Sequence, residues 1–355
     1  MNPEQRASLL AVKLRALITD RAAIDPGWSV HPEKLQPVTF LAGSGLVHAA
    51  GATMWLLVEP SSAGRDPMDT DPSAQPRPPR GWLGGAMVLA GRHGCSQVHL
   101  LGDLLTATDA RRAALSARPM DVWSVRGRVI TRVDAVPYCP PALPTAPAMA
   151  FEAMIIAAGA QAVVEHGVLR AEVDGLEVGR VLTDPDNGDA RLHVGVGRHD
   201  RLAQAMMNEG QDPAVALRHT VDTVRRLRQP QAGSHPANQL AVSRWLRQVV
   251  AERPQLVGMS SLTPVPGTEE PELKRLGPGL LFGDSTVVAC SVGVDLDAAV
   301  DAVDTAVYLG ADRVLLCIPP SSDLTAVRAA AASLVMSVEV LVVPADWADR
   351  ADLVA

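Results

Sequence analysis

Residues 94–125, GCSQVHLLGDLLTATDARRAALSARPMDVWSV, align without a gap on residues 310–341, GADRVLLCIPPSSDLTAVRAAAASLVMSVEVL. Each stretch holds an apolar run, a segment with helical spacing and a second apolar run, which predicts strand–helix–strand. The matching positions include Gly94/Gly310, Val98/Val314, Leu100/Leu316, Arg112/Arg328, Met120/Met336 and Val122/Val338. A repeat of this kind indicates a duplicated unit. The alternative is chance similarity, because the chain is rich in Ala and Arg.

The similarity extends upstream of both stretches. Gly43–Val47 matches Gly277–Leu281, and each pentapeptide is followed by an apolar run, Thr53–Val58 and Thr286–Val292. Each end of the chain therefore predicts helix, two strands, helix, strand, helix and strand. The predicted fold class is α/β (mixed α+β), with two such duplicated blocks flanking a smaller α+β middle module.

Composition places the boundaries between these parts. The predicted domains are an N-terminal block (1–136), a proline-rich linker (137–147), a central module (148–228) and a C-terminal block (229–355). Residues 61–80, rich in Pro, Asp and Ser, predict a disordered surface insert. In the central module, apolar spacing predicts a helix over 148–166, strands over 168–182 and 191–196, and helices near 201–208 and 214–228.

Residue usage excludes several common functions. Only Lys13, Lys34 and Lys274 are lysines, and no Gly-Lys pair exists for a phosphate-binding P-loop. A Gly-x-Ser-x-Gly nucleophile elbow and a His-Glu-x-x-His zinc motif are also missing from the sequence. The first helix has Leu9, Leu10, Leu14 and Leu17 on one face and does not resemble a secretion signal. We therefore expect a cytoplasmic protein without a membrane partner.

The central module holds the candidate catalytic residues. Alternation in Arg170–Asp174 places Arg170, Glu172 and Asp174 on one strand face, and Glu177 follows in LEVGR. Carboxylates on neighbouring strands suit Mg²⁺ beside a phosphodiester, with Arg198 or Arg201 stabilising the developing charge. The alternative is a half-exposed hairpin whose outer face is simply charged.

The same region is rich in arginine. Between Arg198 and Arg253 the sequence has nine arginines against five acidic residues. The predicted phosphate-binding residues are Arg198, His199, Arg201, Arg218 and Arg225, and the alternative is a solvated helix face. A turn at Gly195–Gly197 also allows backbone contact with phosphate, or a tight turn with Asp200 as helix cap. Without an aromatic residue between Arg198 and Leu240, duplex or mononucleotide contact fits better than a single strand.

Two further polar patterns favour structural roles. Asp295-Leu296-Asp297 follows a predicted strand and superficially resembles the phosphatase motif of the haloacid-dehalogenase family. The later lysine and the Thr or Val which that family requires are missing, so acids at a helix start explain the pattern better. His193, His199 and His219 lie near aspartates, but no spacing fixes three or four zinc ligands together.

Val194–Arg201 (VGVGRHDR) and Leu176–Arg180 (LEVGR) resemble segments of a family of hypothetical proteins from high-GC actinobacteria, which implies no particular activity. A more distant resemblance is to the restriction-endonuclease-like fold, whose Asp…Glu-x-Lys signature maps onto Asp174 or Glu172 and Glu177. Arg180, three residues beyond Glu177, departs from that signature and puts cleavage in doubt.

The sequence thus predicts a protein that binds a phosphate-bearing ligand or nucleic acid through its Arg-rich central region. One alternative is a Mg²⁺-dependent nuclease or phosphohydrolase that uses Glu172, Asp174 and Glu177. The other is a non-catalytic scaffold or assembly protein in which duplication supplies paired surfaces. The sequence assigns no cofactor beyond Mg²⁺ in the enzymatic alternative and no oligomeric state.

Overall fold

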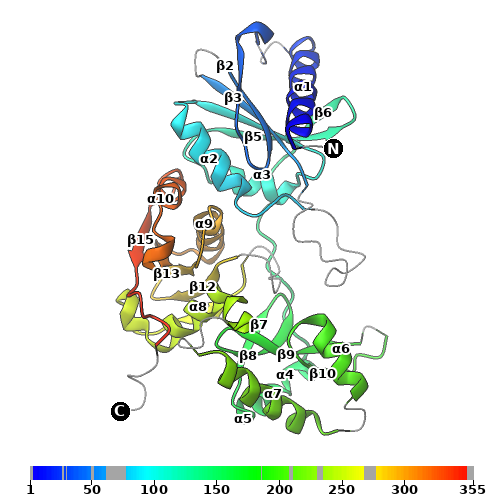
Figure 1. The fold of residues 1–355 in the computed structure, drawn as a ribbon, viewed down its shortest axis with the longest axis vertical. Coiled ribbons are helices and arrows are strands. Elements are labelled where there is room, and N and C mark those ends of the chain that lie inside the picture. Colours follow the sequence, from blue (N-terminus) through cyan, green and yellow to red (C-terminus); the bar gives the residue numbers. More distant parts are fainter. Residues whose placement is uncertain are drawn as a thin grey trace.

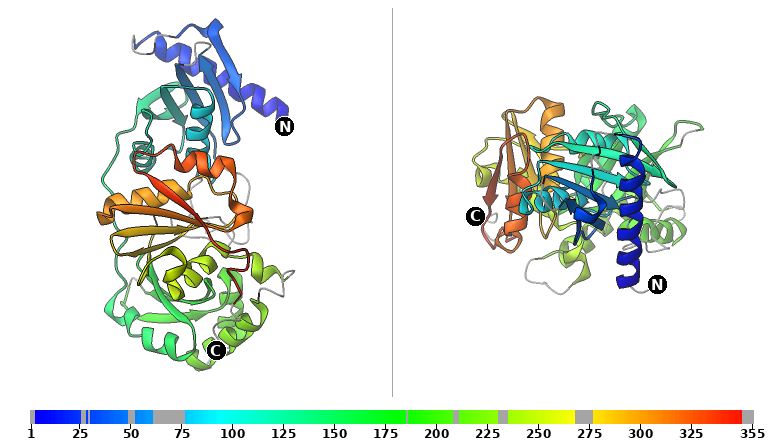
Figure 2. Two further views of the ribbon diagram at one scale, coloured as in Figure 1. Left: turned by 90° about the vertical axis from the view of Figure 1, so that its left-hand side faces the viewer. Right: turned by 90° about the horizontal axis from the view of Figure 1, so that it is seen from above.

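The computed structural model describes residues 3–25, 28, 30–48, 52–60, 77–184, 186–207, 211–229, 235–267 and 277–349. The fold is mixed α+β, with three separate sheets. Figure 1 shows them stacked along the long axis, and Figure 2 shows the same order from two other sides. The C-terminal block lies between the N-terminal block and the central module, so the order in space differs from the order along the chain.

The N-terminal block is a six-stranded sheet in the order β1-β2-β3-β4-β5-β6. Its elements are α1 (Pro3–Ala22), η2 (Pro32–Lys34), β1 (Leu35–Val38), β2 (Gly43–His48), β3 (Thr53–Val58), α2 (Trp82–Arg92), β4 (Gln97–Gly102), α3 (Ala107–Ala113), β5 (Met120–Arg126) and β6 (Val129–Arg132). The pairs β3–β4 and β4–β5 are parallel, and the other pairs are antiparallel. Helix α1 covers one face, and α2 and α3 cover the other.

The C-terminal block is a five-stranded sheet in the order β11-β12-β13-β14-β15. Its elements are α8 (Val242–Glu252), η5 (Pro254–Val257), β11 (Thr263–Val265), β12 (Gly279–Gly283), β13 (Thr286–Cys290), α9 (Ala298–Leu309), β14 (Arg313–Ile318), η6 (Pro320–Ser322), α10 (Thr325–Ala331) and β15 (Val338–Val342). Again the two pairs at the β15 end are parallel and the others antiparallel. Helix α8 covers one face, and α9 and α10 cover the other.

The two outer blocks therefore share strand order, strand directions and helix placement, except that β6 has no counterpart among the described C-terminal residues. Their strand registers differ by two residues from the ungapped sequence match: Val98 pairs with Met120, whereas Val314 pairs with Val338. Met120 thus corresponds in place to Val338 rather than to Met336, because η6 lengthens the connection before α10. Descent from one duplicated unit stays a prediction.

These two blocks share one apolar core. It joins residues of α2, α3, β3 and β4 to residues of α9, α10, β13 and β14. At its edge the turns after α3 and α10 meet in an isolated antiparallel bridge between Ser116 and Leu334. The interface thus resembles the interior of a single domain rather than a contact between two independent units.

A network of buried charges crosses the same interface. Arg80 and Arg112 both donate to Asp301, with Arg112 Nη2 2.5 Å from Oδ1. Arg111 binds Asp304 through Nε and Nη2, each at 2.9 Å. Asp295, the first aspartate of the stretch that superficially resembled a phosphatase motif, belongs to the same network, because Arg80 donates to its carboxylate through Nε at 3.0 Å and Nη2 at 2.9 Å.

Asp297, the second aspartate of that motif, binds the start of α2. Its carboxylate accepts the N–H groups of Gly81 and Gly84 at 2.8 and 2.7 Å. A Cβ on Gly84 would lie 2.0 Å from the carbonyl oxygen of Leu296, so this close approach requires glycine. The acid therefore caps a helix of the other block, where unsatisfied N–H groups favour negative charge.

The central module is an antiparallel sheet in the order β10-β9-β8-β7. Its elements are α4 (Ala146–Met149), α5 (Glu152–Ala157), β7 (Gln161–Glu165), β8 (Val168–Val173), β9 (Leu176–Thr183), β10 (Ala190–Val194), α6 (Gly197–Met207), α7 (Pro213–Leu227) and η4 (Pro236–Gln239). Its apolar core is separate from the one shared by the outer blocks.

The predicted helix over 148–166 is wrong. Two short helices, α4 and α5, are followed by strand β7, which pairs with β8. Gly159, at φ 85°, stops the helix, because a left-handed residue cannot continue a right-handed one. The strand predicted over 168–182 is in fact the hairpin β8–β9. It turns at Asp174 and Gly175, which have φ values of 50° and 71°.

Predictions for the first helix, for two edge strands and for the insert after β3 were less accurate. In α1, Leu14 and Leu17 are buried as predicted, but Leu9 is 59% exposed and Ile18 takes its place in the core. Strands β1 and β11 were not predicted. The predicted disordered insert lies outside the described residues over 61–76, and its last residue, Arg80, is ordered in the interface network. Among the described helices, none has the length and apolar character needed to cross a membrane.

Candidate phosphate-binding surface

Glu172, the first predicted catalytic carboxylate, is fully buried in β8. Its Oε2 accepts from Arg247 Nη2 at 2.5 Å, and its Oε1 lies 3.4 Å from Arg244 Nη1. Both arginines come from α8 of the C-terminal block. Glu172 is therefore part of the contact that holds the central module against that block.

Glu177, on β9, is bound by three arginines. Arg170 and Arg180 donate to it at 2.7 Å, and Arg201, from α6, donates at 2.8 Å. Burial alone would raise the pKa of Glu177, but the hydrogen bond from Arg180 and the charges of all three arginines lower it. The side chain therefore stays ionised and fixes α6 to the sheet.

Asp174, the third predicted carboxylate, lies in the turn between β8 and β9. Its backbone carbonyl accepts from Arg228 Nε at 2.8 Å. The Arg228 guanidinium also stacks on Trp245, 4.5 Å from the ring centroid. Burial is the main reason that the pKa of Arg228 falls to about 10, against the opposing charges of Asp174 and Glu172. This turn thus connects the sheet to α7 and α8.

The three carboxylates do not converge on an open space. Glu172 and Glu177 are register partners on β8 and β9, yet each engages a different set of arginines. In the described part of the chain, no group of three or more His, Cys, Asp or Glu side chains is placed to hold a metal ion. The geometry therefore supports a structural role for them rather than Mg²⁺ binding.

A fourth carboxylate in this cluster was missed. Glu165, at the end of β7, accepts from Arg244 at 2.5 Å and also binds Arg247. The charges of Arg244 and Arg247 outweigh burial, so the pKa of Glu165 is strongly lowered. The sequence prediction put this residue inside a helix. Gln161–Glu165 (QAVVE) shows no apolar–polar alternation, so no local signal marked this strand, which is identified by its pairing with β8.

Exposure divides eight of the nine arginines of this region into two groups, and the ninth, Arg253, is half-buried and donates to the Trp347 carbonyl at 2.6 Å. Arg201, Arg228, Arg244 and Arg247 point into the protein, where the contacts above engage them. The exposed members are Arg198 at the start of α6 and Arg218, Arg225 and Arg226 on α7. Of the predicted phosphate-binding residues, Arg201 is therefore the one that faces inward.

The glycine turn before α6 does not leave room for an anion. The Asp200 carboxylate accepts the N–H of Val196 at 2.6 Å, so it fills the place that a phosphate oxygen would take. Helix α6 begins at Gly197, which puts Asp200 in its first turn rather than at its cap. Arg198 and His199, in the same turn, are exposed.

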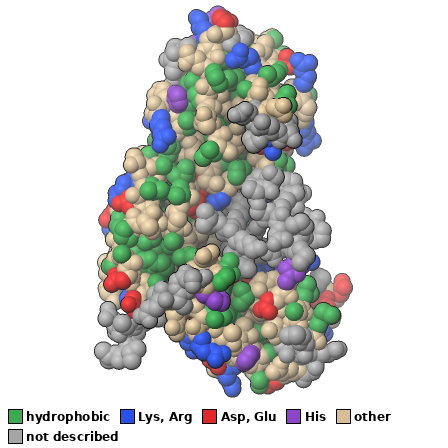
Figure 3. Space-filling model, viewed as in Figure 1, with side chains coloured by type: hydrophobic (Ala, Val, Ile, Leu, Met, Phe, Trp, Pro, Cys, Tyr) green, Lys and Arg blue, Asp and Glu red, His purple; other side chains and the backbone are tan. Residues whose placement is uncertain are grey.

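Helix α7 is strongly two-sided. Its inner side buries Leu217, Thr220, Val221 and Val224. Its outer side exposes Arg218, Asp222, Arg225 and Arg226, which we name the α7 face. Arg225 donates to the Gly159 carbonyl at 2.7 Å, and Arg226 to the Asp222 carbonyl at 3.2 Å, so both guanidinium groups are held close to the helix. Figure 3 shows basic side chains gathered at the end of the molecule where α7 lies.

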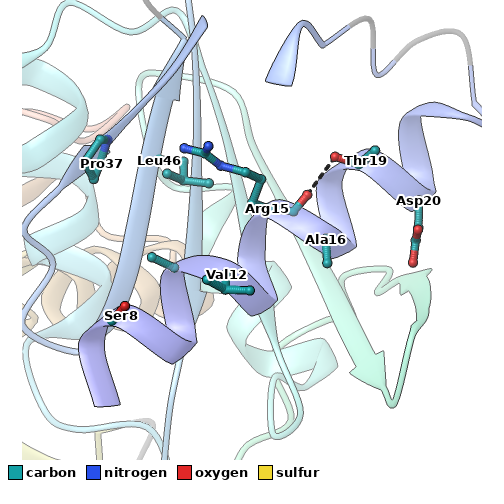
Figure 4. Close-up of a pocket in the computed structure, with 9 residues that line it drawn as sticks. Ser8, Val12, Arg15, Ala16, Thr19, Asp20, Pro37 and Leu46 are labelled. Atoms are coloured by element: carbon teal, nitrogen blue, oxygen red, sulfur yellow. Dashed lines mark hydrogen bonds between the residues drawn. The ribbon is translucent and has the colours of Figure 1, made fainter. Parts of the chain in front are cut away.

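An open groove lies in a different block. About 510 Å³ in volume, it runs between α1 and the strands β1 and β2 (Figure 4). Its lining is mostly small or apolar, and Arg15 reaches across it to donate to the Leu35 carbonyl at 3.2 Å. None of the predicted site residues lines it.

The N-terminal block also buries a histidine among tryptophans. His99 stacks between Trp28 and Trp55, with centroid distances of 4.7 and 5.8 Å. Its Nδ1 accepts from Trp123 Nε1 at 3.3 Å, which requires a neutral ring. Burial is the main reason that its pKa falls to about 4, and the Asp121 carboxylate only partly opposes it.

His99 should make stability depend on pH. Its folded pKa of about 4 lies below the ordinary 6.5, so the unfolded chain takes up the proton first as pH falls. The contribution of neutral His99 to the free energy of unfolding is complete above pH 6.5. It is lost as the pH falls towards 4, a change of about 3 kcal/mol. Burial raises the pKa of Asp297 from 3.8 to about 6, so this carboxyl makes the folded state more stable, not less, as the pH falls.

The test therefore compares the free energy of unfolding of wild type with that of His99→Phe, because the Asp297 effect is common to both. The difference in stability between the two proteins should shrink at low pH. A difference that is constant from pH 7 to 4 would contradict this.

Comparison of the chain with family models, curated proteins and solved structures gave no match. The resemblances drawn from VGVGRHDR and LEVGR stay predictions.

Proposed function

We propose that the protein binds a phosphate-bearing polymer, duplex nucleic acid in particular, through the α7 face. The observation that carries the proposal is the difference between the two arginine groups. Three of the four interior arginines are held by the carboxylates of Glu165, Glu172 and Glu177, and Arg228 by backbone carbonyls. Arg218, Arg225 and Arg226 are instead exposed to solvent around one acid, Asp222.

The form of this surface suits a charged backbone better than a small ligand. Arg218 and Arg225 are two helical turns apart, about 10 Å along the axis, which is longer than one phosphate group. The α7 face offers no Phe, Tyr or Trp side chain for stacking on bases. Contacts from such a face go to phosphates and carry little sequence information.

Charge reversal on the α7 face tests this proposal. Arg218→Glu, Arg225→Glu and Arg226→Glu together should weaken binding of a 20-base-pair duplex at least tenfold, measured by fluorescence anisotropy at low salt. Each lost contact removes the release of bound counterions, which drives this kind of association.

The matched control changes net charge equally elsewhere. Arg126, Arg128 and Arg132 are exposed around the β5–β6 hairpin of the N-terminal block. Converting all three to Glu should leave affinity within about twofold of wild type. Equal losses in both triple variants would show that only net charge matters, and would refute a site on α7.

A further inference from the structure

Strand β15 forms one edge of the C-terminal sheet. On its inner side it pairs in parallel with β14, and no described strand pairs with its outer side. The corresponding strand of the N-terminal block, β5, has its outer side covered by β6 in antiparallel pairing. Figure 2 shows β15 running across the face of the molecule that is turned to the viewer at left.

The direction of the β15 backbone groups follows from one hydrogen bond. The Val343 N–H donates to the Ile318 carbonyl at 2.9 Å, so Val343 faces β14. Backbone groups alternate along a strand, so Glu339 and Leu341 also face inward. The N–H and C=O groups of Val338, Val340 and Val342 therefore point outward.

Side chains along this edge are apolar. Val342 is 38% exposed, and Val335 and Leu324, which lie beside β15 and α10, are 61% and 41% exposed. The single charge within the strand, Glu339, is paired with Arg313 of β14 at 2.6 Å. Figure 3 shows hydrophobic side chains gathered on the side where α10 and β15 lie. Monomeric proteins usually protect an edge with lysine, proline or a bulge, and β15 has none of these.

We propose that β15 pairs in antiparallel fashion with β15 of a second copy of the chain, about a two-fold axis at Val340. In this register Val338 faces Val342, and Val340 faces its own copy. These three are the residues whose backbone groups point outward, so each of these facing pairs exchanges hydrogen bonds, and the pairs of Glu339 with Leu341 between them do not.

The side chains favour a second copy as the occupant. Every hydrogen-bonded pair is Val with Val, and β-branched pairs stabilise neighbouring strands. Glu339 faces Leu341 rather than the other Glu339, so no like charges are directly opposed. A two-fold contact uses the same patch on both molecules, as this sequence allows. The pairing would join two C-terminal sheets into one.

The test is oligomeric state measured by light scattering after size-exclusion chromatography over a range of concentrations. We expect wild type to pass from monomer to dimer as concentration rises. Val340→Pro removes the central outward N–H but none of the inward bonds to β14, and should give a monomer. Val342→Lys adds an edge charge and should do the same. Val129→Lys, at an exposed valine beside the β5–β6 hairpin, should still dimerise.

Hydrogen exchange of backbone amides distinguishes pairing between two copies from folding of a single chain, because only pairing makes protection depend on concentration. Amides of Val338, Val340 and Val342 should exchange more slowly at high concentration, whereas those of Glu339 and Leu341 should be protected throughout. A wild type that remains monomeric at 200 µM would overturn the proposal. So would a dimer that persists in Val342→Lys, which decides the matter if Val340→Pro fails to fold.

Discussion

Glu172→Ala should lower the free energy of unfolding by about 3–5 kcal/mol, because it leaves Arg247 buried without one of its carboxylate partners. Arg247 is 1% exposed and lies 2.5 Å from Glu172. Denaturant unfolding followed by circular dichroism measures the loss. The residue that sequence reasoning selected for catalysis is thus expected to act through stability.

A comparison with an exposed pair makes this prediction specific. Asp20→Ala breaks the ion pair with Arg128, whose side chain is 80% exposed, and should cost about 0–1 kcal/mol. If Glu172→Ala were as mild as Asp20→Ala, the buried network would not support the fold as described. Retained stability together with loss of a Mg²⁺-dependent activity would favour the enzymatic alternative instead.

Asp301→Ala should destabilise the protein to a similar extent, but at the interface between the two outer blocks. Asp301 accepts from both Arg80 and Arg112, and all three side chains are almost fully buried between the outer blocks. Burial by itself would raise the pKa of Asp301, but the two arginines outweigh it and lower the pKa. Removing the carboxylate takes the Asp301 partner from both buried arginines, of which Arg80 keeps its ion pair with Asp295. Because Arg112 is then buried without that partner, a loss of about 3–5 kcal/mol is expected.

A double-mutant cycle with Arg112→Met measures how much of the stability lost in Asp301→Ala comes from the ion pair between Asp301 and Arg112. Because the two side chains contact each other, the double variant should be more stable than the sum of the single losses implies. Additive losses would contradict a direct interaction. Unfolding of Asp301→Ala should also become less cooperative, because the buried ion pairs that join the two outer blocks are weakened.

The order of elements in the outer blocks was predictable from the sequence. Strand β14 (Arg313–Ile318) is the first apolar run of the repeated stretch 310–341, and an apolar run bounded by turn residues identifies a buried strand. Strand β7 was not predictable in the same way. It follows a run of small apolar residues that fits a helix equally well, and only pairing with β8 decides between the two.

The candidate surface was predictable in part. The amphipathic spacing of α7 explains why Arg218 and Arg225 face solvent while Val221 is buried. The same helix ends at Arg228, whose burial depends on the carbonyls of Ala237 and Leu240 and on Trp245, all from later segments. Contacts that distant in sequence leave no local pattern. The ion pair between Arg201 and Glu177 could not be predicted from the sequence for the same reason.

Binding of a 20-base-pair duplex across a salt series tests the central claim most directly. If the α7 face contacts phosphates through Arg218, Arg225 and Arg226, the logarithm of the association constant should fall linearly with the logarithm of salt concentration. Three contacts predict a slope of about −2 to −3, and the triple charge-reversal variant should lose most of it. Salt-independent binding, or no binding to any duplex at low salt, would contradict the account.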